Sequence, residues 1–325
     1  MTLGHALASD RSRNLDPLRL LLAAAVIVSH AWPLALGPGT AEPLEHLTGR
    51  SLGGWAIGVF FFISGLLITA SAERKSAARF WVSRVRRIVP GLGAALFVTL
   101  ALAFASGATA DLPEAISWFF RALTLVSIEH RLTGAFATNP YPEVLNGPLW
   151  SLFYEVLAYA ICAAFVWAGG TRHLMAVWVF MALAAMMCLV HSALPARMAT
   201  FAPLFASFAL GMAAYIWRDR IVMRPASVAV ALLLAYFLPE HLSLGVVGAG
   251  LVLFAMSAPV MTLRNDASYG MYIYGWPIAQ MLVAVLPGIG PVQLAILSLL
   301  ATYPVALLSW HFFERPALAK RPAVA

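Results

Sequence analysis

Charged residues are scarce in this sequence. They make up 11% of its 325 residues, whereas a typical soluble protein has about 25%. Hydrophobic residues make up 62%, against roughly 45–50% in soluble domains. A chain with this much apolar surface to bury is not intrinsically disordered, and the composition also excludes a collagen and a coiled coil. The sequence therefore predicts an all-α, polytopic membrane protein.

Cysteine and the common catalytic motifs are also nearly absent. Cys162 and Cys188 both lie inside apolar segments, so we expect neither a disulfide framework nor a cysteine metal site. The eight histidines form no H-E-x-x-H pattern, and the sequence contains no G-x-S-x-G elbow and no P-loop. We therefore expect no metal ion among the cofactors.

Ten apolar segments approach the length that crosses a bilayer, about 20 mostly apolar residues. They are residues 17–36, 54–72, 87–108, 148–168, 173–192, 200–217, 225–239, 243–262, 268–287 and 291–312. We predict about ten transmembrane helices in a single membrane domain, residues 1–325. Residues 1–16 and 313–325 are expected to be cytoplasmic tails, and residues 109–147 a long extracytoplasmic loop with room for an amphipathic interfacial helix. The first segment is expected to be a retained span and not a signal peptide, because no clear cleavage site follows it.

Lysine and arginine gather on one side of the predicted spans. With a cytoplasmic N-terminus, seventeen fall on the inner side and four on the outer side. The inner residues are Arg11, Arg13, Arg19, Arg74, Lys75, Arg79, Arg84, Arg86, Arg87, Arg172, Arg218, Arg220, Arg224, Arg264, Arg315, Lys320 and Arg321. This bias predicts that both termini are cytoplasmic. It also explains the net charge of +7 without a nucleic-acid partner.

Arg19 and His30 are ionisable residues of the first apolar segment. They are eleven residues apart, and at about 100° per residue both reach nearly the same helix face, about 16 Å apart along the axis. Ionisable groups inside a span are costly, so each is a functional hypothesis. The alternative is that Arg19 extends to the membrane surface and His30 is a hydrogen-bonded packing residue. The aligned pair favours a polar cavity that opens inward.

Arg84 and Arg87 lie in a basic cluster at the start of the third apolar segment. They are three residues apart and share a helix face. Forked guanidinium groups suit phosphate. The alternative is that both arginines only anchor the helix at the cytoplasmic surface, as the positive-inside rule describes.

Glu155 lies about two turns into the fourth apolar segment. A carboxylate at that depth needs a cationic or hydrogen-bonding partner, and the sequence leaves open whether it serves structure or chemistry. Ser64 and Gly65, in the second segment, are typical of close helix packing. An aromatic belt explains the polar and aromatic residues at the start of the ninth segment, which are Ser268, Tyr269, Tyr272 and Tyr274.

Six short motifs follow one another along the chain. They are Arg19 to His30, Phe61 to Ile68, Arg84 to Arg87 with the following Pro90, Leu149 to Glu155 with Trp150, Ser268 to Tyr272, and Glu314 to Pro316. In this order they resemble the acyltransferase 3 family of integral membrane acyltransferases, over residues 14–320. The chain departs from the pattern at Gly275, where many members have histidine, and at Val156, where a second acidic residue is common. The resemblance is to the form without an appended SGNH-type domain.

The resemblance implies transfer of an acyl group, commonly acetyl, from cytoplasmic acyl-CoA to a hydroxyl of an extracytoplasmic or lipid-linked carbohydrate. The expected location is the inner membrane, with membrane lipids and a carbohydrate or glycolipid as partners. His30, Arg19 and Glu155 become the expected catalytic residues, and imidazole suits a general base near neutral pH. Arg84 and Arg87 become the expected acyl-CoA ligands. Substrate or structural contacts are expected of Ser64, Gly65, Trp150, Ser268, Tyr269 and Tyr272.

Two other classes of membrane protein remain open. Buried Arg, His and Glu also suit a proton-coupled secondary transporter, although residues 1–170 and 171–325 show no correspondence of the kind that inverted repeats produce. A flippase or polysaccharide-export component is the other alternative. Release of CoA from acetyl-CoA by the purified protein separates an acyltransferase from both.

Overall fold

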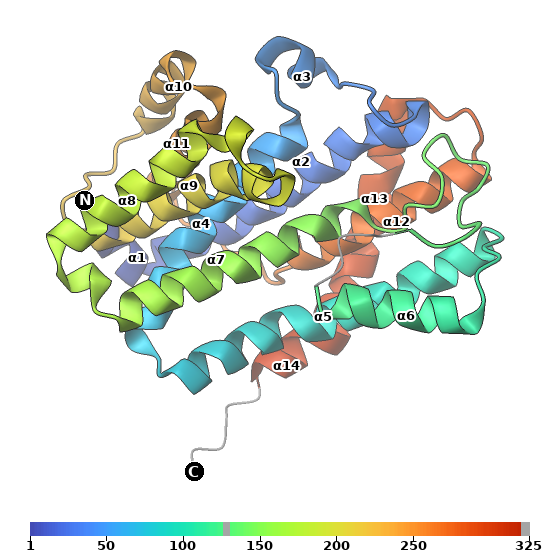
Figure 1. Ribbon diagram of the computed structural model, residues 1–325, viewed down its shortest axis with the longest axis horizontal. Helices are drawn as coiled ribbons and strands as arrows, with labels where there is room; N and C mark the ends of the chain where they lie inside the picture. The colour runs from blue at the N-terminus through green and yellow to red at the C-terminus, as the bar shows by residue number, and fades with distance from the viewer. Residues whose placement is uncertain (126–130, 320–325) are drawn as a thin grey trace. The chain divides into compact units, whose positions relative to one another are not determined.

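The computed structural model describes residues 1–125 and 131–319. A helix forms in each of the ten predicted segments (Figure 1): α2 Leu15–Leu36, α4 Leu52–Arg74, α5 Ala77–Ala105, α7 Trp150–Trp167, α8 Leu174–Leu189, α9 Ala196–Ile216, α10 Ser227–Phe237, α11 Glu240–Ser257, α12 Ser268–Val285 and α13 Pro291–Ser309. The described residues contain two isolated β-bridges and no β-strand. The all-α prediction is therefore confirmed for this part of the chain.

Seven helices of the described chain are long and apolar enough to cross a membrane, judged by length and composition. They are α2, α4, α5, α7, α9, α11 and α13, some of them together with short helical turns at their ends. The apolar helices α8 and α10 are shorter, with 16 and 11 residues. These helices agree with a polytopic membrane protein, while the count of ten spans and the orientation of the termini stay predictions.

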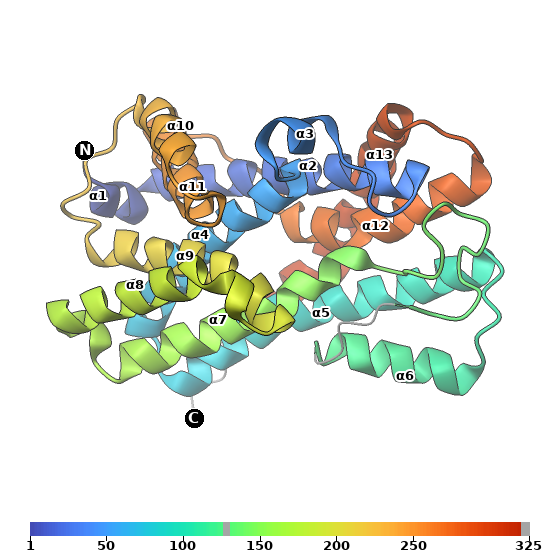
Figure 2. The same ribbon diagram turned by 45° about the horizontal axis from the view of Figure 1, so that its top comes forward.

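Shorter helices lie between and beyond these ten, some of them in the segments expected as tails and loop. They are α1 Leu3–Ala8 and η1 Asp10–Asn14 near the N-terminus, α3 Pro43–Thr48, α6 Leu112–Leu123, η2 Gly147–Leu149, η3 Gly170–Arg172, η4 His191–Ala193, the π-helix η5 Trp310–Glu314 and α14 Arg315–Ala319. Helix α6 begins where Asp111 accepts a 2.8 Å hydrogen bond from the Glu114 N–H, as an N-cap does. It runs beside α5 in both ribbon views (Figures 1 and 2). Residues 126–130, Lys320 and Arg321 lie outside the described residues.

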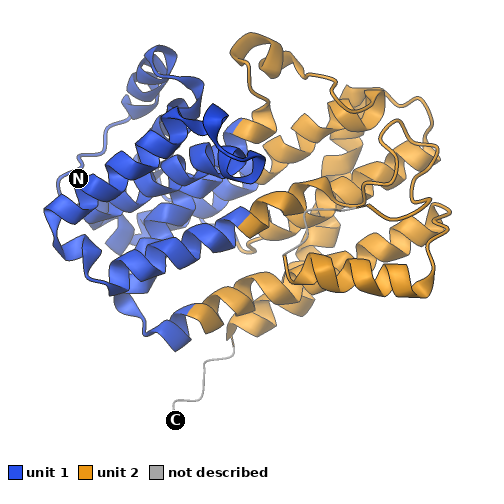
Figure 3. Ribbon diagram, viewed as in Figure 1, with its two compact units in different colours: residues 1–22, 55–80, 154–263 blue, residues 23–54, 81–153, 264–325 orange. Residues whose placement is uncertain are grey.

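The chain folds into two compact units that alternate along the sequence (Figure 3). Unit 1 consists of residues 1–22, 55–80 and 154–263. Unit 2 consists of residues 23–54, 81–153 and 264–325. The boundaries fall inside α2, α4, α5 and α7, so these long helices contribute residues to both units.

In unit 1, α4 and α9 approach closely at two glycines. A Cβ atom on Gly65 would overlap the carbonyl oxygen of Phe208, and one on Gly211 would overlap the carbonyl oxygen of Phe62. Small residues at such a crossing let two helix backbones come together in a membrane. This contact gives Gly65 the packing role that its sequence context favours.

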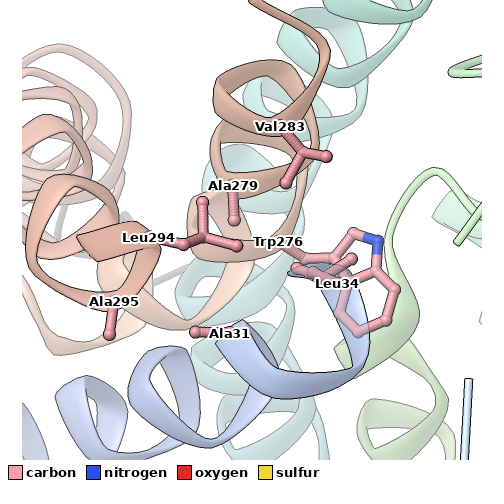
Figure 4. Packing of buried hydrophobic residues seen from close by; sticks show 7 residues of the cluster. All are labelled: Ala31, Leu34, Trp276, Ala279, Val283, Leu294 and Ala295. Carbon is pink, nitrogen blue, oxygen red and sulfur yellow. The ribbon is translucent and has the colours of Figure 1, made fainter. Parts of the chain in front are cut away.

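In unit 2, the C-terminal half of α2 packs with α12 and α13 around a hydrophobic cluster (Figure 4). Its buried members are Ala31, Leu34, Trp276, Ala279, Val283, Leu294 and Ala295. Trp276 is 5% exposed, and it also forms part of the wall of a cavity. The cluster therefore fixes one side of the site described next.

Candidate active site

Unit 2 contains a cavity of about 560 Å³ at the C-terminal half of α2. It is lined by Ser29, His30, Pro33, Gly39, Thr40, Glu42, Glu45, Ser51, Arg131, Tyr141, Val144, Gly147, Trp150 and Trp276. The volume falls within the roughly 300–1,000 Å³ of small-molecule sites. The lining includes parts of the segments 39–51 and 131–147, which the charge count places on the outer side. The side of the membrane to which the cavity opens, which the sequence predicted as the inner side, stays a prediction.

His30 lies in the wall of this cavity and has an unsatisfied nitrogen. Its ring packs edge to face against Trp276, with 5.0 Å between centroids and 76° between planes. The Nε2 atom is buried and has no hydrogen-bond partner among the described residues. Buried polar atoms are nearly always paired in folded proteins, so each exception calls for a functional explanation. His30 therefore has one ring nitrogen that no described protein group satisfies.

Arg19 shares the continuous helix α2 with His30, but the two belong to different units. The one-face spacing predicted from the sequence agrees with an unbroken helix over Leu15–Leu36. Arg19 is not among the residues that line the His30 cavity. A role for Arg19 beside His30 accordingly stays a prediction.

A buried amide network fixes the loop that forms one wall of the cavity. Gln280, which is completely buried, donates from Nε2 to the carbonyl oxygens of Tyr141 at 2.7 Å and Val144 at 3.1 Å. Asn139 donates to Gln280 Oε1 at 2.8 Å. Trp276 Nε1 also donates to the Val144 carbonyl, at 2.9 Å. The sequence motifs do not include Gln280 or Asn139, although an amide inside an apolar segment, such as Gln280, is a signal of this kind of network.

Arg87 is held by a partly buried ion pair in unit 2. Its Nη2 lies 2.6 Å from Asp266 Oδ2, and the two side chains are 19% and 16% exposed. The guanidinium carbon lies 6.0 Å from the centre of the Tyr269 ring, a cation–π distance. Ser268 donates from Oγ to Asp266 Oδ1 at 2.6 Å, and Tyr269 donates to the Ile88 carbonyl at 3.0 Å. Ser268 and Tyr269 thus support this ion pair.

Arg84 lies one turn before Arg87 on α5 and has a different environment. Its Nε and Nη2 atoms each lie 3.4 Å from Ser83 Oγ, a long hydrogen bond on the same helix. From the sequence, Arg84 and Arg87 are predicted to act together as an equivalent pair. For Arg87 the structure adds an ion pair with Asp266, which lies 179 residues away along the chain.

Glu314 is a buried carboxylate that the sequence indicated only as part of a motif. It is 1% exposed, ends the π-helix η5 and accepts a 3.0 Å hydrogen bond from Ser309 Oγ. A Cβ atom on Gly91 would meet both Tyr269 and Glu314 at about 3 Å, so Glu314 lies beside the Arg87 cluster. Single turns of π-helix inside α-helices are frequent at functional sites.

Glu155 has hydroxyl partners in unit 1. Its Oε1 accepts hydrogen bonds from Ser64 Oγ at 2.9 Å and from the Tyr159 hydroxyl. The expectation that this carboxylate has a hydrogen-bonding partner inside the helix bundle is confirmed. The hydrogen bond from Ser64 also places this residue beside Glu155, although the two are 91 residues apart in the sequence.

Helix α12 connects the Arg87 cluster with the His30 cavity inside unit 2. Between Tyr269 and Trp276 lies Tyr272, whose hydroxyl is 2.6 Å from Ser151 Oγ and donates to the Pro148 carbonyl at 2.8 Å. These bonds fix the start of α7, next to Trp150 in the cavity wall. At about 1.5 Å per residue, Tyr269 and Trp276 are roughly 10 Å apart along the helix.

The packing around Gly275 agrees with the absence of a histidine at this position, where many members of the family have one. It is buried on α12, and an added Cβ would come within 2.5 Å of Ile27 Cγ1 and 2.9 Å of Ile27 Cδ1. A histidine ring at this position has no space unless Ile27 moves.

Comparison with known proteins gives one family and two full-length relatives. Residues 12–311 match the family model described as an acyltransferase domain. The chain is 28% identical over 366 residues to nodulation protein 10 of Rhizobium leguminosarum bv. viciae, which covers 98% of this chain and 96% of the relative. It is also 28% identical over 347 residues to an O-acetyl transferase of Shigella phage Sf6, with 95% and 97% covered. No solved structure matches the chain.

Proposed function

The chain belongs to the acyltransferase 3 family, and we propose that it transfers an acyl group, acetyl by preference, from acyl-CoA to a hydroxyl of a carbohydrate. The donor binds on the cytoplasmic side of the inner membrane, and the acceptor is an extracytoplasmic or lipid-linked sugar. The name of the phage relative, O-acetyl transferase, supports an oxygen acceptor. Family membership favours this enzyme over the transporter and flippase alternatives.

The observation that carries the proposal is the unpaired Nε2 atom of His30 in the wall of the cavity. In the proposed reaction, Nε2 accepts the proton of the acceptor hydroxyl while its oxygen attacks the thioester carbonyl. A carbon–oxygen bond forms and the carbon–sulfur bond breaks. The CoA sulfur leaves as a thiolate, and the imidazolium returns its proton to that sulfur. Positioned acid–base groups contribute about 10²–10⁴-fold to such steps.

The donor site is proposed at the Arg84 and Arg87 end of unit 2. Arg87 is oriented by Asp266 and Tyr269, and guanidinium groups form strong hydrogen bonds with phosphate. Helix α12 leads from this cluster toward the cavity over roughly 10 Å, at about 1.5 Å per residue. The extended thioester arm of acyl-CoA is suited to span such a separation between its phosphates and the reacting carbonyl.

Acyl transfer itself is tested by two measurements. Purified protein is expected to release CoA from acetyl-CoA, and cells that express it are expected to gain O-acetyl groups on their surface glycans by mass spectrometry. Neither change is expected from a transporter or a flippase. Surface glycans that are identical with and without the protein, together with stable acetyl-CoA, would overturn the proposal.

The orientation of the chain gives the first specific prediction. Reporter fusions at residues 125 and 325 are expected to lie on opposite sides of the membrane, because the 109–147 segment is outside and the C-terminus inside. A phosphatase reporter, active only outside, and a fluorescent reporter, active only inside, provide complementary readings at each position. If both positions report the same side, the predicted orientation is wrong.

Replacement of Arg84 gives the second prediction. Arg84→Ala is expected to weaken acyl-CoA binding about tenfold or more, the effect of losing a charge-assisted hydrogen bond. The dissociation constant is measured by calorimetry on the purified protein. Arg79→Ala, which removes an exposed arginine of the same helix, is the matched control and is expected to bind normally. If wild type, Arg84→Ala and Arg79→Ala all bind acyl-CoA with the same affinity, Arg84 serves only as a membrane anchor.

A further inference from the structure

We infer that the His30 cavity binds the acceptor as an uncharged sugar ring, and that Glu45 makes it select neutral over acidic sugars. The inference rests on the proposed function and adds to it the chemical class of the acceptor. It comes from the residues that line the cavity in unit 2 and from what each of them already contacts.

Three charged side chains line the cavity, and two of them are already engaged. Arg131 lies 3.4 Å from Glu143 in an ion pair. Glu42 is 3% exposed, and its Oε1 accepts a hydrogen bond from the backbone N–H of Leu52. The carboxylate of Glu45 forms neither a hydrogen bond nor an ion pair within residues 1–125 and 131–319. Glu45 is therefore the lining carboxylate that has no partner in the described part of the chain.

Aromatic side chains supply the rest of the recognition surface. Tyr141, Trp150 and Trp276 line the cavity, and the Tyr141 and Trp276 rings lie edge to face with centroids 5.4 Å apart. Trp276 is 5% exposed and its N–H is bonded to the Val144 carbonyl, so the less buried Tyr141 and Trp150 are the rings available for contact. Amphipathic rings of this kind suit a ligand with an apolar face and a polar edge. A pyranose ring has both, since its C–H bonds form the face and its hydroxyls the edge.

The same geometry brings a sugar hydroxyl to His30. The His30 and Trp276 ring centroids are 5.0 Å apart, and both residues line the same cavity as Tyr141 and Trp150. Buried Gln280 holds the Tyr141 and Val144 wall in place. Binding groups and the proposed base are thus parts of one preformed cavity.

The carboxylate of Glu45 determines which sugars fit electrostatically. An ionised carboxylate only accepts hydrogen bonds, through two oxygens, and sugar hydroxyls are donors of the matching kind. A uronic acid brings a second carboxylate close to the first. Repulsion between like charges within a few ångströms of a partly buried site is expected to weaken binding by about tenfold or more.

Saturation-transfer difference NMR on the full-length protein in nanodiscs tests the inference without requiring turnover. The probes are the methyl glycosides of glucose, galactose and mannose, each paired with its uronic acid. Wild-type protein is expected to give signals from at least one neutral glycoside and to bind its uronic partner at least about tenfold more weakly. Glu45→Gln is expected to remove that difference. With Trp150→Ala, neither the neutral glycoside nor its uronic acid is expected to give a signal. Glu240→Gln, which removes a carboxylate from outside the cavity lining, is expected to keep the wild-type preference.

Three results would overturn the inference. They are equal binding of both members of every pair by wild type, an unchanged preference in Glu45→Gln, and no signal from any sugar. Each can occur while the protein still acetylates surface glycans, because CoA release and glycan mass spectrometry measure the proposed function separately.

Discussion

Replacement of His30 by glutamine is expected to lower the rate of acyl transfer about 10²–10⁴-fold, the usual contribution of a positioned acid–base group. Glutamine is similar in size and still forms hydrogen bonds, but it cannot take up the proton of the attacking hydroxyl. The buried, unpaired Nε2 atom in the cavity wall makes His30 the residue with the largest expected kinetic effect. The measurements are the O-acetyl content of surface glycans and the initial rate of CoA release by purified protein.

The controls for His30→Gln separate chemistry from folding. The melting temperature and the acyl-CoA dissociation constant are expected to stay near wild type, because Nε2 has no partner in the described structure that its removal would leave unpaired. His46→Gln, an exposed histidine of α3, is expected to transfer at the normal rate. If His30→Gln retains near-normal turnover, His30 is a packing residue and Glu155 becomes the next candidate for the base.

The helices were predictable from the sequence because lipid imposes a simple rule on the backbone. Every buried N–H and C=O must be paired, so a long apolar run in a membrane is a helix. The ten apolar segments therefore all contain helices. Their ends were less predictable, since α5 begins at Ala77, ten residues before the apolar run at 87. Its first turns contain charged residues that hydropathy does not count toward a span.

The candidate site was predictable only where one helix carries the signal. His30 stood out because a titratable residue in an apolar segment is costly. The partners that build the site come from distant segments: Asp266 for Arg87, Gln280 for Tyr141 and Glu45 for the cavity. No periodicity in a single sequence connects such positions. The pairing of Arg87 with Asp266 was equally out of reach, because the two residues are 179 positions apart along the chain.

Replacement of Arg87 by alanine is expected to destabilise the protein by about 3 kcal/mol, the penalty for removing one partner of a buried ion pair. Asp266 would be left with its charge in a site where it is 16% exposed. The loss is measured as a fall in melting temperature in nanodiscs. Arg79→Ala, which removes an exposed arginine of the same helix, is expected to change stability much less.

The role of Asp266 makes the Arg87 prediction specific. Asp266→Asn is expected to weaken acyl-CoA binding without touching the ligand, because it releases the guanidinium that the donor phosphates require. The double variant Arg87→Ala, Asp266→Asn removes both charges together. Its stability loss is expected to be smaller than the sum of the two single losses, since coupled residues are not additive and no unpaired charge remains. If the losses add, or if Asp266→Asn binds acyl-CoA as wild type does, Arg87 is not positioned by Asp266.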